Sequence, residues 1–215
     1  MNTIMKTAFA ATAIVAAAPA SAAIVITQSP GAVQPEENVL FDVDQAVDTT
    51  VIGTTNNTNT VVEFVSDETL DVSGSSGQAR IEGVDGSLDS LLVRLADDQF
   101  TFTEFEFNLF NPDNGTTSVT ITLSDGTVQM FDLSPNGQNF FGIQATDGST
   151  LTSVAFQTDG TGVADVRQVR IGGIASVTAA VPEPATWALL LLGFFGIGGM
   201  MRRTGTVRSL DVTYG

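Results

Sequence analysis

The stretch TSVTITL at residues 117–123 alternates between polar and apolar side chains from Ser118 onward. Successive side chains of a β-strand point to opposite faces of the sheet, so this stretch predicts a strand with one buried and one exposed face. The same period recurs at residues 60–65, 90–95, 128–133, 140–145, 151–156 and 166–171. No helical period stands out between the two ends of the chain. The predicted fold class is therefore all-β, an antiparallel, jelly-roll-like β-sandwich formed by residues 23–180.

Turn signals separate these segments. Asp-Gly followed by Ser or Thr occurs four times, beginning at Asp85, Asp125, Asp147 and Asp159, and Asn-Gly occurs twice. These residue types accept the positive φ that a type I′ hairpin turn requires, which favours tight turns between antiparallel strands. The alternative is that the aspartates bind calcium.

The phenylalanine-rich stretch at residues 100–110 contains a change of parity. Phe100 and Phe102 have one parity, whereas Phe105, Phe107 and Leu109 have the other. A β-bulge at the Thr103-Glu104 step would keep all five on the core face. We therefore expect a core strand here rather than an aromatic strip that binds a ligand.

The charge of the central domain is strongly negative. The chain has 215 residues and a formal net charge of −16, and residues 24–181 carry 22 Asp and Glu against four Arg, a net charge of −18. Such a surface repels phosphate backbones, so nucleic acid is not expected as a partner. Two of the four arginines, Arg167 and Arg170, lie three residues apart and are predicted to face opposite sides of a strand, one of them paired with a nearby Asp.

Several kinds of chemistry are excluded by composition. The chain has no Cys and no His, and residues 24–181 have no Lys, Tyr or Trp. Disulfides, thiol nucleophiles and histidine bases are absent, which leaves a pair of carboxylates as the common route to acid–base catalysis. No pair stands out among so many acidic residues, and no catalytic motif is present. We predict that the domain is not an enzyme.

One acidic cluster has the ligand type that calcium prefers. Asp42, Asp44 and Asp48 follow a predicted strand closely, and Glu36-Glu37 lie nearby. Carboxylate oxygens suit Ca²⁺, although the spacing differs from that of an EF-hand loop. The sequence predicts a calcium site at these three aspartates, with a solvated acidic surface as the alternative.

The N-terminal residues 1–22 have the features of a secretory signal peptide. Lys6 provides the positive charge, an alanine-rich apolar stretch follows, and Ala20-Ser21-Ala22 has the small residues of a cleavage site. Cleavage is expected after Ala22 or Ala23. The alternative is a buried N-terminal helix.

The C-terminal end has three ordered features. Pro182-Glu183-Pro184 is followed by Trp187, within an uncharged apolar segment at residues 185–201, and then by Arg202-Arg203. Seventeen uncharged residues with an interfacial tryptophan and a basic end predict one C-terminal transmembrane helix. The basic end belongs on the cytoplasmic side, so residues 23–181 would lie outside. A buried core helix is the alternative.

Together these features resemble the PEP-CTERM sorting signal of Gram-negative bacteria. The resemblance implies export, processing by a membrane transpeptidase called exosortase, and a role in exopolysaccharide and biofilm. Residues 204–215 extend beyond the basic pair as a short cytoplasmic tail. The alternative is a plain membrane anchor that is never cleaved.

The predicted function is structural. We expect a cell-surface or extracellular-matrix protein, transiently anchored in the inner membrane, that divalent cations bridge to acidic exopolysaccharide. The alternatives are a carbohydrate-binding module that uses polar loops such as residues 56–59, and a glycan-active enzyme that uses paired carboxylates.

Overall fold

The computed structural model describes residues 23–74, 79–111, 118–135, 137–160, 162–177 and 184–203. The chain divides into two compact units, residues 1–176 and 177–215. The described residues of the first unit are mostly β-strand, and those of the second include one helix. The elements are β1 (Ala23–Gln28), β2 (Glu37–Phe41), β3 (Asp48–Thr55), β4 (Val61–Ser73), β5 (Arg80–Gly83), β6 (Ser90–Leu95), β7 (Phe100–Thr101), β8 (Glu104–Asn111), β9 (Ser118–Leu123), β10 (Val128–Asp132), β11 (Gly137–Thr146), β12 (Ser153–Asp159), β13 (Asp165–Gly172), β14 (Ala175–Ser176) and α1 (Pro184–Arg203).

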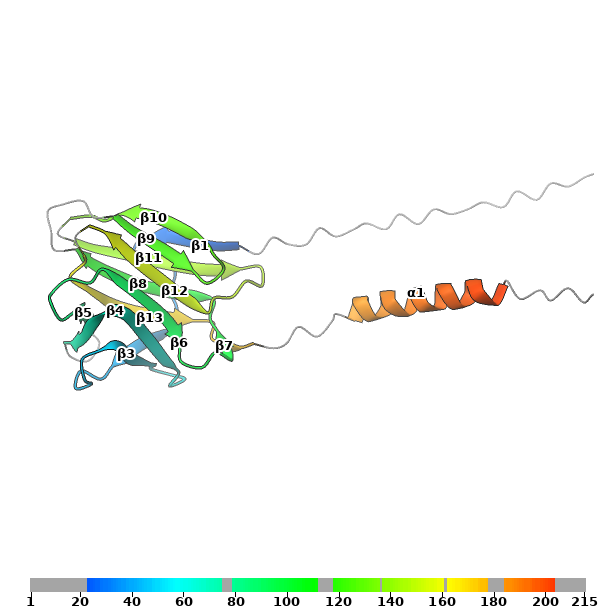
Figure 1. Ribbon diagram of the computed structural model, residues 1–215, viewed down its shortest axis with the longest axis horizontal. Coiled ribbons are helices and arrows are strands. Elements are labelled where there is room, and N and C mark those ends of the chain that lie inside the picture. Colours follow the sequence, from blue (N-terminus) through cyan, green and yellow to red (C-terminus); the bar gives the residue numbers. More distant parts are fainter. Residues whose placement is uncertain are drawn as a thin grey trace, which may run out of the picture. The chain divides into compact units, whose positions relative to one another are not determined.

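The strands form an antiparallel β-sandwich. Hydrogen bonds link them in the order β1-β11-β8-β13-β2-β3-β4-β6-β12-β9-β10, β5 pairs with both β13 and β4, and β14 pairs with β7. This path folds back on itself, so the layer containing β4, β6, β12, β9 and β10 covers the layer containing β13, β8 and β11 (Figure 1). The all-β sandwich prediction is confirmed.

Phenylalanine side chains join the two layers. Phe107 on β8 lies 5.4 Å from Phe141 on β11 and 6.2 Å from Phe156 on β12, measured between ring centroids. Phe131 on β10 packs edge-on against Phe141. These rings come from both layers, and the centre of the sandwich is therefore a single apolar core.

The parity change in the phenylalanine segment coincides with an interruption between two strands rather than with a β-bulge in one strand. β7 ends at Thr101 and β8 begins at Glu104, while Phe102 forms an isolated bridge with Leu151. Phe102, Phe105, Phe107 and Leu109 are buried, and Phe100 is partly buried against the core. The core role is confirmed, but the continuous bulged strand is not.

The Asp-Gly turns are of two kinds. Asp147 and Gly148 both have positive φ, and Ser149 N donates to Thr146 O, as in the predicted type I′ turn. At Asp125-Gly126 only the glycine has positive φ, and Gly126 N donates to Leu123 O. This is a type I turn that ends in a left-handed glycine. In it the Asp125 carboxylate accepts a hydrogen bond from Thr127 N and stabilises the loop.

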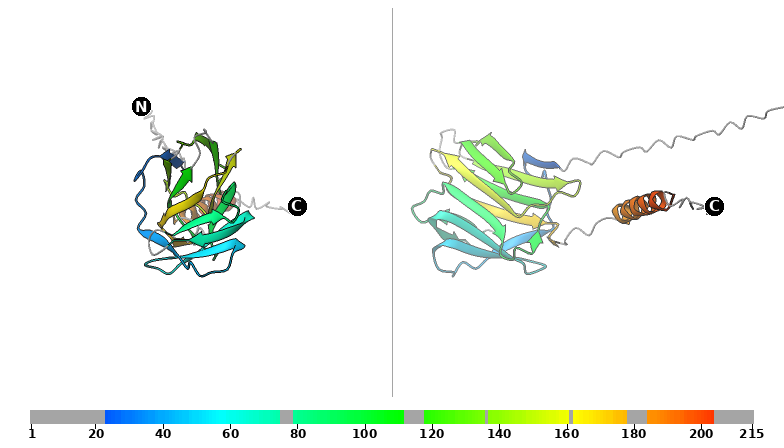
Figure 2. Two further views of the ribbon diagram at one scale, coloured as in Figure 1. Left: turned by 90° about the vertical axis from the view of Figure 1, so that its left-hand side faces the viewer. Right: turned by 45° about the vertical axis from the view of Figure 1, so that its right-hand side comes forward.

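The segment between β1 and β2 crosses the outer side of the β11-β8-β13 layer, as the left panel of Figure 2 shows in blue. Val33 packs so closely on Gly142 that a side chain at Gly142 would lie 2.9 Å from it. Pro35 O accepts a hydrogen bond from Arg170 Nη2, and Glu36 accepts one from Gly173 N. We call residues 29–36 the strap. Part of this face is thus buried beneath it.

The second unit contains α1, which includes the predicted apolar segment. Within the part of the chain that the structure describes, no helix is both long and apolar enough to cross a membrane. The spanning role predicted for residues 185–201 is therefore not confirmed.

Candidate binding groove between β2 and β13

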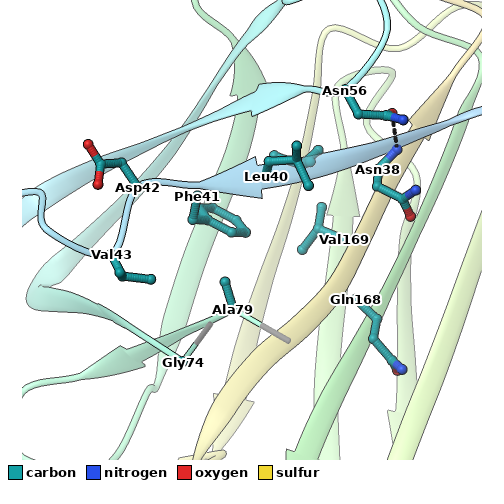
Figure 3. A pocket seen from close by; sticks show the side chains of 11 residues that line it. Asn38, Leu40, Phe41, Asp42, Val43, Asn56, Gly74, Ala79, Gln168 and Val169 are labelled. Atoms are coloured by element: carbon teal, nitrogen blue, oxygen red, sulfur yellow. Dashed lines mark hydrogen bonds between the residues drawn. The ribbon is translucent and has the colours of Figure 1, made fainter. Parts of the chain in front are cut away.

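A groove of about 740 Å³ opens where β13 changes its pairing partner (Figure 3). One half of β13 pairs with β5 through Val166 and Arg167, and the other half pairs with β2 through Arg170 and Ile171. β2 and β5 therefore diverge from a common neighbour and leave a gap. The groove is lined by Asn38, Val39, Leu40, Phe41, Asp42, Val43, Asn56, Gly74, Ala79, Gln168 and Val169.

A β-bulge in β13 creates this change of partner. Arg167 lies opposite Asn108 of β8 and Arg170 lies opposite Glu106, so two residues of β13 face the single residue between them on β8. Gln168 has a φ of 54°, a left-handed conformation that is uncommon for glutamine. Residues held in such conformations cluster at functional sites, and the bulge turns Gln168 outward at the rim of the groove.

The bulge also corrects the prediction for the two arginines. The extra residue places Arg167 and Arg170 on the same face of β13, not on opposite faces. Arg167 forms a two-point ion pair with Asp165 and lies over the Phe110 ring, so the predicted pairing with an Asp is confirmed. Arg170 lies 3.9 Å from Glu106.

A buried amide orients Gln168. Asn108 is fully buried on β8, and its Nδ2 donates to Gln168 Oε1 over 3.0 Å. The Oδ1 atom of Asn108 has no hydrogen-bond partner among the described residues. Because its oxygen is occupied, the Gln168 amide presents its N–H donors to a ligand.

The β2 side of the groove combines amide and aliphatic groups. Asn38 and Leu40 point outward from β2, and Leu40 is 47% exposed. Asn56 fixes the position of Asn38: its Oδ1 accepts a hydrogen bond from Asn38 N, and its own N donates to Asn38 O. In the close-up, Val169 projects from β13 toward Leu40 and Phe41 (Figure 3).

Glu37 anchors the loop next to this side. Its carboxylate accepts hydrogen bonds from the backbone N–H groups of Asn57 and Thr58 and from the Thr58 hydroxyl. Burial opposes ionisation of Glu37, but these hydrogen bonds outweigh it and lower its pKa. The ionised glutamate therefore holds residues 56–58 in place beside the groove.

The groove is suited to binding rather than to acid–base catalysis. Among its described lining residues, Asp42 is the one titratable group, so the groove has no second carboxylate to act as its partner. Amides that both donate and accept hydrogen bonds alternate with aliphatic surface. This combination matches a neutral ligand with hydroxyl groups and apolar C–H faces.

The predicted calcium residues are placed separately. Asp42 lines the groove and accepts a hydrogen bond from Asp44 N, whereas Asp48 starts β3 and accepts one from Thr49 N. Across the residues that the structure describes, no group of three or more acidic side chains is arranged to hold a metal ion. The structure does not bring Asp42, Asp44 and Asp48 together as a metal-binding group.

The predicted targeting residues lie largely outside the described residues. This applies to Ala20 and Ala22 at the cleavage site and to Pro182 and Glu183 of the sorting motif. Pro184 begins α1, and Trp187, Arg202 and Arg203 fall within its bounds, but their side chains are not described. Of the polar loop 56–59, Asn56 reaches the groove.

Sequence reasoning missed Asn38 and Gln168. The signal for Gln168 was present, because the buried residues Val166, Val169 and Ile171 change parity within β13. This is the signature that predicted a bulge in the phenylalanine segment. Asn38 has no comparable signal, since its importance depends on β13 lying beside β2.

Comparison with known proteins identifies the C-terminal segment. Residues 180–203 match the PEP-CTERM protein-sorting motif, which confirms the predicted resemblance. A motif of this type implies an exported protein that an exosortase processes. No curated protein matches the chain.

Three solved structures show weak likeness. A variant of the family 29 carbohydrate-binding module CBM29-2 has 14% identity and a TM-score of 0.31, and the match covers 75% of this chain and 99% of that chain. A second CBM29-2 variant has 17% identity and a TM-score of 0.28, with 54% and 83% covered. The enzymatically active domain of bacteriophage CBA120 tailspike protein 4 has 12% identity and a TM-score of 0.26, with 69% and 19% covered. TM-scores this low establish neither fold nor ligand for this chain.

Proposed function

We propose that this chain is a cell-surface or extracellular-matrix protein that exosortase sorts, and that its acidic β-sandwich has an interaction role in exopolysaccharide. The sorting motif at residues 180–203 is the observation that carries the proposal. In this scheme the Pro182-Glu183-Pro184 segment is presented to the processing enzyme, while α1 and Arg202-Arg203 hold the chain transiently at the inner membrane.

The intact mass of the protein recovered from the cell surface and medium of its native host tests this proposal. We expect loss of the signal peptide together with everything beyond the Pro182-Glu183-Pro184 region. A recovered protein that retains residues 185–215 would contradict exosortase processing and would indicate an uncleaved anchor.

The groove favours a second function, binding of a neutral glycan. Asn38 and Gln168 supply amide groups at the rim, and Leu40 and Val43 supply exposed aliphatic surface. Sugar rings present hydroxyls at their edges and C–H groups on their faces. The hydroxyls can hydrogen-bond to the amides of the groove, and the C–H faces can pack on its aliphatic side chains. The groove lacks lysine and arginine among its described lining residues, which disfavours an anionic ligand.

Affinity gel electrophoresis of the full-length protein in gels containing dextran, glucomannan or hydroxyethylcellulose tests glycan binding. We expect at least one of these polysaccharides to retard the protein, and Leu40→Lys to weaken that retardation. Val84→Lys is the control, because Val84 is 59% exposed and lies outside the groove. Equal retardation of both variants and the parent would exclude the groove as the binding site.

A further inference from the structure

The opposite layer of the sandwich has a trench on its outer face. It has a volume of about 600 Å³ and crosses β4, β6, β12 and β9, which lie side by side at the front of Figure 1. Its described lining shares no residue with the groove. The trench is lined by Val65, Ser66, Asp67, Ser90, Leu91, Leu92, Thr120, Thr122, Ala155, Phe156 and Gln157.

The strand register sorts the outward side chains into two rows across the strands. One row is polar, because Thr120 lies opposite Gln157, and Gln157 lies opposite Ser90. The second row is offset from the first by two residues on each strand. In this row Ala155 lies opposite Thr122 on one side and Leu92 on the other. Hydroxyl and amide groups thus follow one side of the trench, and mainly aliphatic groups follow the other.

Both rows of positions continue onto the edge strand β10, where the two side chains are apolar. Met130 lies opposite Thr120, and Val128 lies opposite Thr122. They are 64% and 61% exposed. Five strands at a spacing of about 4.8 Å give the rows a length of roughly 19 Å. This length accommodates several units of an extended chain rather than one small molecule.

The charge of the trench indicates which polymer suits it. Asp67 is the one charged residue in its described lining, and a hydrogen bond from Ser90 Oγ lowers its pKa. Residues 24–181 carry a net charge of −18, so an anionic polymer is repelled. A neutral glycan instead matches both rows, its hydroxyl groups against the polar row and its C–H faces against the aliphatic row.

The two layers differ in how far their outer faces are covered. The strap buries part of the β11-β8-β13 face, where Glu106 is 5% exposed. By contrast, Gln157 and Thr122 in the trench are exposed, as are Val128 and Met130 beside it on β10. An extended chain can therefore reach the trench along its length.

We infer that the trench is a second glycan-binding surface, distinct from the groove, so that one molecule binds two neutral glycan chains and cross-links them. This inference rests on the proposed glycan-binding function. Two sites on one rigid sandwich would join chains of a matrix without any change in the oligomeric state of the protein.

The test uses the full-length protein with dextran, glucomannan and hydroxyethylcellulose, and with alginate as the anionic comparison. Ala155→Lys places a long charged side chain on the aliphatic row, and Ala96→Lys makes the same substitution at an exposed loop position. Affinity gels measure binding, and clustering of beads coated with the bound polysaccharide measures cross-linking. Circular dichroism checks that each variant folds.

We expect the parent protein and Ala96→Lys to bind a neutral polysaccharide and to cluster the beads. Ala155→Lys and Leu40→Lys should each lower affinity about tenfold, abolish clustering and leave residual binding, since each blocks one site. If Ala155→Lys clusters the beads as strongly as Ala96→Lys does, the trench is not a second binding site. That result would leave the proposal for the groove unaffected. Loss of all binding in Leu40→Lys would also contradict a second site in the trench. If the parent binds none of the neutral polysaccharides, both the proposed glycan-binding function and the second site are contradicted.

Discussion

At the scale of single residues, Glu37 links the ionisation of one buried carboxylate to the shape of the groove. Its pKa is lowered from the ordinary value of 4.5, because hydrogen bonds from Thr58 and Asn57 outweigh burial. A lowered pKa contributes stability that is present above the ordinary value and is lost as the pH falls through the folded-state pKa. We expect Glu37→Gln to lower the free energy of unfolding by about 1 kcal/mol at pH 7.

Urea unfolding between pH 7 and pH 3 measures this effect. The curves of the parent and Glu37→Gln should converge as the pH falls from 4.5 through the lowered folded-state pKa, because below that pKa the folded parent also carries a neutral side chain. Glu36→Gln is the neighbouring control, since Glu36 is exposed and accepts one hydrogen bond, from Gly173 N. A constant difference at every pH would contradict the role of the charge.

Glu106 behaves in the opposite way. Burial under the strap raises its pKa although Arg170 lies close by, and its Oε2 atom has no hydrogen-bond partner among the described residues. A raised carboxylate pKa means that the folded state binds the proton more tightly. Stability therefore decreases as the pH rises from the ordinary value of 4.5 through the folded-state pKa.

Glu106→Gln should accordingly stabilise the protein at pH 7, by about 1 kcal/mol, and have little effect at pH 3. The neutral amide retains the shape of the protonated acid without the cost of burying a charge. Thermal unfolding at both pH values measures the difference. Destabilisation at pH 7 would instead show that the ion pair with Arg170 outweighs the burial of the charge.

The sequence could reveal some of these residues and not others. Buried phenylalanines were predicted, because a parity pattern depends on the local chain alone. Glu37 and Glu106 could not be separated from the other acidic residues, since their burial arises from the Asn57-Thr58 loop and from the strap. Asn38 and Gln168 meet at the groove although they are 130 residues apart in the chain.

At the scale of the secondary-structure elements, the bulge of β13 controls the groove. Gln168 adopts a left-handed φ, which costs roughly 1–2 kcal/mol for a residue with a β-carbon and more for a β-branched one. We expect Gln168→Val to lower the free energy of unfolding by about 2 kcal/mol. Gln168→Gly should be far less destabilising, since glycine adopts this φ freely although it loses the hydrogen bond to Asn108.

Urea unfolding of these variants tests that ranking. Gln138→Val is the matched control, because Gln138 is exposed on β11 and does not have a positive φ. If both valine variants have the same stability, the bulge is not under backbone strain.

Element prediction was most accurate for the short strands. The predicted strands at 90–95 and 128–133 correspond closely to β6 and β10, whereas the strand predicted at 60–65 continues to Ser73 in β4. The C-terminal extension of β4 pairs with β5, whereas the first half of β4 pairs with β3 and β6. This change of partners depends on long-range contacts, so no local sequence pattern predicts it. β3 was not predicted, and β2 was expected only as the strand that precedes Asp42, without bounds.

At the scale of the whole molecule, net charge sets the response to ions. A net charge of −18 over residues 24–181 opposes the compact state through self-repulsion, and salt screens this repulsion. We expect the melting temperature to rise by about 3 °C between roughly 0.02 and 0.5 M NaCl, the shift that about 1 kcal/mol produces in a domain of this size. A melting temperature that falls or stays constant would contradict the repulsion.

A comparison of calcium with magnesium distinguishes charge screening from specific binding of an ion. A bound ion adds stabilisation that grows with the logarithm of its concentration, whereas screening by CaCl₂ and MgCl₂ at equal concentration is the same. Because Asp42 and Asp48 already accept hydrogen bonds from their own loops, we expect equal melting temperatures in the two salts. A higher value in CaCl₂ that disappears in Asp44→Asn would instead support the calcium site predicted from the sequence. A bound calcium ion could then bridge this acidic domain to an acidic polysaccharide. Such a bridge would act in addition to the binding of neutral glycans proposed for the groove and the trench.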